Sequence, residues 1–497
     1  MNSPVTDGPP RQHYGLTLAA LAAAALAYAL MQTMVAPALP EIQRDLGTST
    51  SSVTWVLTIY LLAASVATPV FGRLGDIFGK ERVLLLVLVF FGLGSLLAAL
   101  SHSLALLIAG RAIQGAGGAV FPLAFGIIRD EFPEKKVATG IGLISATFGI
   151  GGGAGLVLSG LIVDHLAYEW IFWLGLGGTA VAVVATLLFV PESPVKTPAR
   201  VDWAGAALMS VGLASILLGV SEGNDWGWGS AGVLGLFAAG IAVLVAWGIF
   251  ESRVAEPLVS MDLMRLRGVW TTNLAGFLVG FGMFGSFILI PQFVQAPATA
   301  GYGFAASVTE AGLFLLPSAA VMLVAGPLAG GLGTRYGSRL PMLIGALVGC
   351  SAFVLLSLSH SARTSIYVAS GILGLGIGFA FASMANLIVE AVPQRNTGEA
   401  TGINTIMRTV GGALGAQIAA SLVAGHLDPD TGIPLETGYT DAFVMSAAGM
   451  FVAFLAALLV PRRPRPTADE VEGSDDGKVV PLTRRDQTLL GPGGRAK

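Results

Sequence analysis

Charged residues are scarce in this chain of 497 residues, since only 11% are Asp, Glu, Lys or Arg whereas 54% are hydrophobic. Soluble domains carry about 25% charged residues, so a water-soluble globular protein is excluded. The formal net charge is −3 and no segment forms a basic domain, which argues against nucleic acid as a partner. The last 37 residues hold 8 of the 27 basic and 6 of the 30 acidic residues. The rest of the chain is therefore suited to the interior of a lipid bilayer.

Cysteine and histidine are also rare. The single cysteine, Cys350, excludes an intrachain disulfide. The five histidines are scattered without metal-binding spacing, and no phosphate-binding loop of the Gly-x-x-x-x-Gly-Lys-Ser/Thr type occurs. We therefore expect no metal, no cofactor and no enzymatic activity, and ATP-driven pumping by this chain is disfavoured.

Long apolar segments make up most of the sequence. A helix needs about 20 apolar residues to cross a bilayer, and fourteen segments meet this requirement. They lie near residues 16–39, 53–71, 83–101, 104–128, 137–162, 169–190, 203–221, 230–250, 270–291, 307–331, 339–358, 364–388, 400–425 and 441–460. The first segment is longer than the apolar core of a signal peptide, so it is interpreted as a retained span.

Basic residues lie mostly on one side of these spans. The connections on the side of the N-terminus, together with the start of the tail, hold eighteen Lys and Arg, and the opposite connections hold only Arg44 and Arg363. Because cytoplasmic loops accumulate positive charge, we expect residues 1–15 and 461–497 in the cytoplasm and the protein in the cell membrane. The tail is rich in proline, glycine and charge, which predicts disorder.

Two pairs of similar segments indicate that the chain consists of two duplicated halves. Residues 72–79 (GRLGDIFG) recur as 330–337 (GGLGTRYG), and the glycine and threonine pattern of 139–149 recurs at 401–411. Transporters are often built from such repeats. We therefore expect an all-α integral membrane protein with two related six-helix bundles and an inserted helix pair. The expected domains are the N-terminal bundle 16–190, the inserted pair with its linkers 191–268, and the C-terminal bundle 269–460.

The segment that follows the second span carries glycines, an acid and several bases. Glycine suits a tight turn, and Asp76 among bases suits ion pairs that break and re-form; an ordinary positively charged loop is the alternative. The segment resembles the loop signature of the major facilitator superfamily, Gly-x-Leu-x-Asp-x-x-Gly-Arg/Lys, at every defining position. The resemblance implies contacts from Asp76 to Arg82 or Arg129 and to a helix N-terminus. The implied gating loop comprises Gly72, Asp76, Gly79, Lys80, Arg82 and Arg129.

Two further spans carry motifs that resemble those of the same superfamily. In span 4, Arg111 and Gln114 lie one turn apart, well below the helix end, and resemble its Arg-x-x-Gln-Gly pattern. Buried arginine is costly in a membrane and usually functional. Span 5 resembles the antiporter motif of drug exporters, although close helix packing is an alternative reason for its small residues. The glycines concerned are Gly149, Gly151, Gly155 and Gly160.

With the Asp225-Trp-Gly-Trp-Gly string in the insert, residues 15–460 resemble the fourteen-span drug/proton antiporter family. Two departures stand out. Leu156 replaces a proline of the span 5 motif, and Met31 replaces the acidic residue of the span 1 signature. The second departure argues against a simple proton-carrying carboxylate in span 1.

Other polar groups lie deep in the spans. Gln32, Asn386 and the pair Asn404 and Arg408, which share one helix face, are candidates to contact substrate together with Arg111 and Gln114. Hydrogen bonding between helices, or to helix ends, is the alternative in each case.

The resemblance implies alternating access around a cavity lined by spans 1, 2, 4, 5, 9, 10, 12 and 13, with the inserted pair outside the transport core. It implies proton-coupled export of small amphipathic compounds. A facilitator or importer of a defined metabolite is one alternative. A membrane scaffold or receptor without transport is another, and the buried Arg111 and Arg408 argue against it.

The acidic residues leave the membrane interior free of negative charge. None of the 30 acids lies near the middle of a span, whereas the two deep charges are both positive. We therefore expect the cavity to prefer neutral or anionic amphipathic compounds over dications. Proton coupling would then run through acids at the span edges, for which Asp164 and Glu310 are the candidates.

Overall fold

The computed structural model describes residues 14–193, 195, 201–428, 431 and 433–461. The expectations for most of the N-terminal segment and for the tail, namely cytoplasmic location and disorder, lie outside the described residues.

The described chain is almost entirely helical, with one isolated β-bridge between Leu427 and Pro434 and no β-strand. The α-helices are α1 (Tyr14–Asp45), α2 (Thr50–Phe78), α3 (Lys80–Ala99), α4 (Leu104–Gln114), α5 (Val120–Glu131), α6 (Glu134–His165), α7 (Glu169–Phe189), α8 (Trp203–Ser221), α9 (Gly223–Trp226), α10 (Ala231–Glu251), α11 (Met261–Arg265), α12 (Arg267–Phe284), α13 (Ser286–Gln295), α14 (Val308–Tyr336), α15 (Arg339–Leu358), α16 (Arg363–Ala391), α17 (Thr397–Ala424) and α18 (Glu436–Ala457). Short 3₁₀ helices cover Gly115–Ala119 (η1), Ala298–Ala300 (η2) and Gln394–Asn396 (η3).

Fourteen helical segments in the described residues are long and apolar enough to cross a membrane. The predicted all-α membrane fold with fourteen spans is confirmed. Two of these spans are not continuous α-helices, because η1 separates α4 from α5 and Gly285 separates α12 from α13.

The helices extend beyond the apolar runs that predicted them. The largest correction concerns the predicted gating loop, because residues 72–78 form the last two turns of α2 instead of a loop. Only Gly79, with φ 110°, interrupts the helix before α3 begins. The repeated segment at residues 330–337 has the same structure, since α14 continues to Tyr336 and Gly337 adopts φ 85°. Glycine is the residue that tolerates this positive φ, so each repeat ends its helix at the last glycine of the motif.

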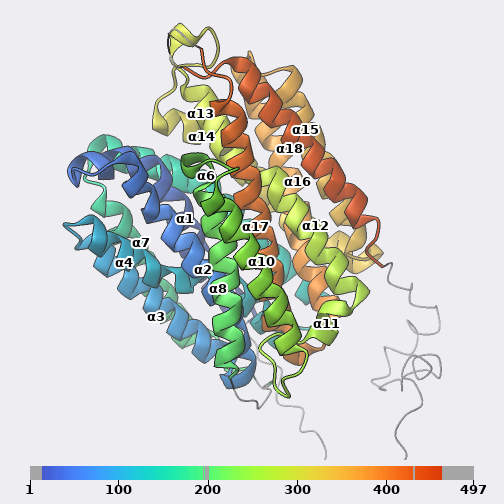
Figure 1. Cartoon of the computed structure of the whole chain (residues 1–497). Helices are drawn as coiled ribbons and strands as arrows, with labels where there is room; N and C mark the ends of the chain where they lie inside the picture. The colour runs from blue at the N-terminus through green and yellow to red at the C-terminus, as the bar shows by residue number, and fades with distance from the viewer. Residues whose placement is uncertain (1–13, 194, 196–200, 429–430, 432, 462–497) are drawn as a thin grey trace, which may run out of the picture. The chain divides into compact units, whose positions relative to one another are not determined.

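The N-terminal helices α1–α7 and the C-terminal helices α12–α18 meet along two interfaces. In one interface α6 packs against α14, and in the other α2 packs against α17. The inserted helices α8 and α10 pack against each other, and α8 also contacts both α2 and α17. In Figure 1 the pair lies in front of the boundary between the blue N-terminal helices and the yellow to red C-terminal helices.

Candidate functional site

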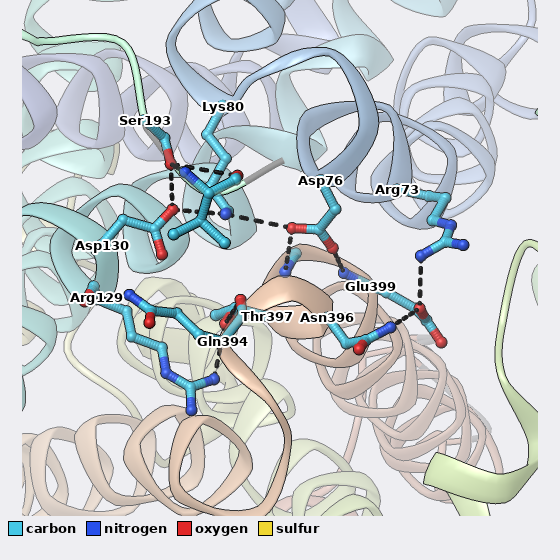
Figure 2. A network of polar contacts seen from close by, with 12 residues as sticks. Arg73, Asp76, Lys80, Arg129, Asp130, Ser193, Gln394, Asn396, Thr397 and Glu399 are labelled. Atoms are coloured by element: carbon cyan, nitrogen blue, oxygen red, sulfur yellow. Dashed lines mark hydrogen bonds and ion pairs between the residues drawn. The ribbon is translucent and has the colours of Figure 1, made fainter. Parts of the chain in front are cut away.

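The end of α2 meets the beginning of α17 through the Asp76 carboxylate. Its Oδ1 and Oδ2 accept hydrogen bonds from the backbone N–H groups of Gly398 and Glu399, at 3.2 and 3.0 Å. The first N–H groups of a helix lack partners within the helix and carry partial positive charge, so they bind a carboxylate well. The implied contact with a helix N-terminus is present, and it joins residues more than 300 positions apart. We call this contact, together with the other polar residues that are labelled in Figure 2, the latch.

Two glycines allow the helices to approach closely enough for this contact. A Cβ on Gly72 would lie 2.6 Å from the Gly398 carbonyl oxygen, and a Cβ on Gly398 would lie 2.5 Å from the Gly72 carbonyl oxygen. Both positions therefore exclude a side chain unless the helices separate. The first glycine of the motif is thus a packing residue of the latch.

Lys80 supplies the positive charge beside Asp76. Its Nζ lies 3.5 Å from Asp76 Oδ1 and 2.6 Å from Asp130 Oδ2, and the three side chains are fully buried. Asp130 also accepts a hydrogen bond from the Ser193 hydroxyl. Gly126 leaves the space for the lysine stem, because a Cβ there would lie 2.6 Å from Lys80 Cδ. Buried charges are stable only when paired in this way.

Glu399 extends the latch to a second ion pair. Its Oε2 lies 3.3 Å from Arg73 Nη1 and accepts from Asn396, and its Oε1 accepts from the Ser260 N–H at 2.6 Å. Glu399 and Arg73 are both buried. Sequence reasoning did not place Arg73, Asp130 or Glu399 in the site. The available signal was that each is a charge directly at the end of an apolar span.

The two predicted arginine partners of Asp76 have other contacts. Arg129 donates to the Thr397 hydroxyl and to the Val392 carbonyl, both at 2.7 Å, so it joins α5 to the start of α17. Arg82 pairs with Glu192 at 2.7 Å and is largely exposed. Lys80, and neither arginine, is the cation within 4 Å of the Asp76 carboxylate among the described residues.

A cavity of about 310 Å³ lies between the two sets of helices, beyond the latch. It is lined from α1, α2, α6, α8, α12, α13 and α17, by Gln32, Thr33, Ala36, Thr54, Leu57, Thr58, Tyr60, Leu61, Leu62, Phe148, Leu156, Leu217, Val220, Ser221, Phe284, Ile288, Thr409, Gly412, Ala413, Ala416, Gln417 and Ala420. None of these lining residues is charged. Spans 4, 10 and 12 contribute nothing to this lining, whereas α8 of the inserted pair does, which differs from the expected arrangement.

Gln32 lines the cavity, and its Oε1 has no hydrogen-bond partner among the described residues. Arg111 and Gln114 lie behind the lining, fully buried. Arg111 donates to the Val56 carbonyl at 3.1 Å and to Gln114 Oε1 at 2.8 Å, and its guanidinium lies 3.9 Å from the centre of the Tyr60 ring. Because Tyr60 lines the cavity, the ring separates this charge from the cavity.

Arg408 has a similar environment on the opposite set of helices. Its guanidinium lies 4.1 Å from the centre of the Phe381 ring and 5.7 Å from that of Phe148, which lines the cavity. Its Nε has no hydrogen-bond partner among the described residues. Aromatic faces attract cations, so they stabilise both deep arginines without a carboxylate.

The remaining predicted polar residues join helices. Asn386 donates to the Ala138 carbonyl at 3.3 Å, from α16 to α6. Asn404 donates to Asn273 at 3.0 Å, from α17 to α12. In the structure both side chains make the helix-to-helix hydrogen bonds that were the alternative to substrate contact.

Of the four glycines of the span 5 motif, all on α6, two face α1 and two face α14. Side chains at Gly151 and Gly155 would meet Ala29 and Thr33 of α1, whereas at Gly149 and Gly160 they would meet Met322 and Thr309 of α14. This set therefore provides close packing on both sides of one helix.

The candidate proton residues lie at the end of the helices opposite the latch, and both are exposed. Asp164 accepts a hydrogen bond from the Thr309 hydroxyl at 2.9 Å, which joins α6 to α14. Glu310 forms a capping box with Ser307 at the start of α14.

This arrangement of two helix sets, a cavity between them and a polar contact that closes one end is the architecture of a membrane transporter. The model of the Major Facilitator Superfamily matches residues 21–416 and 272–491, and the chain belongs to this family. It is therefore a multi-pass membrane transporter that acts on small substrates, and not an enzyme.

Several relatives have names that describe multidrug transport or antibiotic export. The chain is 30% identical to the multidrug transporter protein MdtP of Bacillus subtilis over 91% of this chain and 83% of the relative. It is 30% identical to the tetracenomycin C resistance and export protein of Streptomyces glaucescens, over 83% and 77%. It is 32% identical to the cephamycin export protein CmcT of Amycolatopsis lactamdurans, over 88% and 90%. The crystal structure of the human organic anion transporter TETRAN has the same fold, with a TM-score of 0.64, 16% identity and coverage of 90% of this chain and 100% of that chain.

Proposed function

We propose that this transporter exports small amphipathic compounds across the cell membrane by alternating access, driven by the proton gradient. The observation that carries the proposal is the latch, which joins the two helix sets at one end, with the cavity beyond it. The two relatives that are named export proteins support the direction of transport. One proton charge crossing 100 mV supplies about 2.3 kcal/mol, which sustains a gradient of about fiftyfold.

Two rigid bodies would carry the motion, namely the six-helix bundles of residues 16–190 and 269–460. We infer from the excess of basic residues that the latch end faces the cytoplasm, in which case the latch closes the cavity to the cytoplasm. A cysteine at Ser474, in a Cys350→Ser background, should resist an impermeant thiol reagent on intact cells and react after lysis. Labelling on intact cells would show that the tail, and with it the latch end, faces the outside of the cell.

The cavity supports a preference for neutral or anionic compounds. Its lining has no acid to attract a cation, and Arg408 and Arg111 lie behind its aromatic wall. We expect cells to export the neutral dye Nile red or the anion fluorescein better than the dication propidium. Arg408→Ala should raise propidium export relative to Nile red by several-fold. Strong propidium export that Arg408→Ala does not change would contradict this preference.

Proton coupling is proposed to run through Asp164 and Glu310. Protonation of Asp164 would weaken the acceptor of the Thr309 hydrogen bond between α6 and α14. Asp164→Asn should therefore make export less sensitive to the external pH. The exposed Asp225→Asn is a matched control, and an unchanged pH dependence in Asp164→Asn would remove this residue from the coupling.

Inverted membrane vesicles test the function as a whole. Vesicles that contain the transporter should accumulate Nile red or fluorescein when acidified inside, and a protonophore should abolish the accumulation. Equilibration without accumulation would favour a facilitator, and accumulation in right-side-out vesicles would favour an importer. No flux of any probe would favour a membrane scaffold or receptor.

A further inference from the structure

The inserted helix α8 forms part of the cavity wall. Leu217, Val220 and Ser221, from its last two turns, line the cavity together with residues of α2 and α17. Since α8 contacts both of these helices, it fills the space where they do not meet. A helix outside the transport core would have no such residues.

A cluster of hydrogen bonds holds this end of α8 in place. The hydroxyls of Thr58 on α2 and Ser221 on α8 are 2.9 Å apart, and Gln417 of α17 donates to the Ser221 carbonyl at 3.4 Å. Asn224 donates to Gln417 at 2.9 Å, and the Trp228 indole donates to Ser421 at 3.0 Å. This cluster joins the insert mainly to α17.

The aromatic string of the insert explains the shape of this cluster. Trp228 packs directly over Gly223, where a Cβ would lie 2.8 Å from the indole ring. Its ring also stacks on Phe237 of α10, with 6.5 Å between centroids. Gly227 adopts φ 86°, which turns the chain so that Trp228 reaches α17.

The other end of the insert is fixed as well. Met209 and Leu213 of α8 pack in an apolar cluster with Val70 of α2 and Ile406 of α17. The linker that follows α10 donates the Ser260 N–H to Glu399 in the latch. Packing at both ends gives α8 a fixed position beside the cavity.

We propose that α8 is a substrate-contacting wall that determines which compounds the transporter accepts, an inference that rests on the proposed export function. The wall offers the hydroxyls of Thr58 and Ser221 and the amide of Gln417 beside the apolar Leu217 and Val220. This chemistry fits an uncharged amphipathic compound whose aromatic or aliphatic body lies on the apolar side chains. One hydrogen-bonding group of the compound would replace a bond of the cluster. Such a pocket, mostly apolar with a few placed polar groups, is typical of ligand sites.

Substrate protection tests the contact directly. Ser221→Cys and Ser252→Cys are compared in a Cys350→Ser background of the full chain, purified in detergent. Ser252 directly follows α10, the other inserted helix, and is exposed outside the spans. A small methanethiosulfonate reagent should label both, and Nile red should slow labelling at Ser221→Cys alone. Labelling of Ser221→Cys that Nile red does not change, or no labelling at all, would overturn the inference.

A bulky substitution tests selectivity. Leu217→Trp should reduce export of Nile red by about tenfold, because the indole occupies the cavity. It should reduce export of the neutral compound chloramphenicol much less, because chloramphenicol has a single ring and a flexible side chain in place of the rigid fused rings of Nile red. Val211→Trp, which adds the same ring outside the cavity, should leave both rates near those of the unsubstituted protein. The change in the ratio of the two rates identifies a role in selection, since a merely unstable variant would lower both rates alike.

The outcomes separate the two proposals. If the unsubstituted protein exports Nile red and Leu217→Trp leaves the ratio unchanged, the wall proposal is overturned and the export function stands. If the unsubstituted protein exports neither compound, both proposals are overturned. Membrane content of each variant, measured by immunoblot, normalises the rates.

Discussion

The two interfaces between the helix sets are built in opposite ways. Along α6 and α14, small residues bring the helices together over their whole length, from Gly330 against Ala138 to Gly160 against Thr309. Along α2 and α17, the helices meet over the end of α2 and the start of α17, from Asp76 to Pro69 against Gly402, and farther along they are separated by the cavity and α8. The repeat explains part of this difference, because Thr334 stands on α14 where Asp76 stands on α2.

The comparison indicates how each interface can change. Glycine packing depends on shape and is lost when any atom is added. A carboxylate at a helix N-terminus depends on charge, and water can replace its partners when the helices separate. We therefore expect the α2–α17 interface to open and close during transport and the α6–α14 interface to serve as the continuous contact about which the sets rotate.

The largest effect is expected from a side chain in the α6–α14 interface. In Gly326→Val, the added atoms would meet the Gly142 carbonyl and Ala146, so the helices must separate. Such overpacking costs about 1–3 kcal/mol or more, and we expect a lower thermal midpoint and less protein in the membrane. Gly331→Val, on the same helix, is the matched control because no atom lies within 4 Å of its Cβ position. Equal stability of the two variants would show that this interface is not closely packed.

Asp76→Asn should have a smaller and different effect, on turnover instead of folding. The amide keeps the size of the side chain but removes the charge that binds Lys80 and the start of α17. We expect the latch to open more readily, with a shift of about 1–3 kcal/mol in the conformational equilibrium and slower export. Export is measured at matched membrane content, with Thr334→Val, at the repeat position, as the control. An unchanged export rate in Asp76→Asn would show that the charge of Asp76 in the latch has no role in the transport cycle.

The sequence predicted the helices well because apolar length is a local property. It misplaced their ends at the latch, since Gly72–Phe78 continues α2 although it contains Arg73 and Asp76. Those charges are tolerated in a buried helix end only because Lys80 and Glu399 neutralise them. Lys80 is only four residues after Asp76 and belongs to the same motif, whereas Glu399 comes from a distant segment and has no local sequence pattern.

The candidate site was predicted only in part, because contacts between distant segments leave no local sequence pattern. The motif identified Asp76 and a helix N-terminus as its partner, but not Glu399, which is 323 residues away. The position of α8 was not predictable, because this helix is apolar on all sides and its sequence does not indicate which face meets the cavity. The aromatic rings that face Arg111 and Arg408 also come from other helices, so only the structure joins them.

The smallest expected effect concerns Glu222, which directly follows the cavity-lining Ser221 at the end of α8 and lies outside the spans. Burial raises the pKa of its carboxyl above the ordinary value, and the neighbouring Asp225 carboxylate adds to this increase. Below the ordinary pKa of glutamate, about 4.3, the group is protonated whether the chain is folded or unfolded. As the pH rises, the unfolded chain loses this proton first, so the folded state loses stability until its own carboxyl ionises.

Glu222→Gln has no ionisable group at this position, so its stability does not fall with pH in this way. Its thermal midpoint should match that of the unsubstituted protein at pH 4 and exceed it by about 1–2 °C at pH 8. The exposed Asp225→Asn should give a smaller increase at pH 8. A lower midpoint for Glu222→Gln at pH 8 would mean that the folded protein stabilises the carboxylate, and that the end of α8 resembles the charged latch more than an apolar wall.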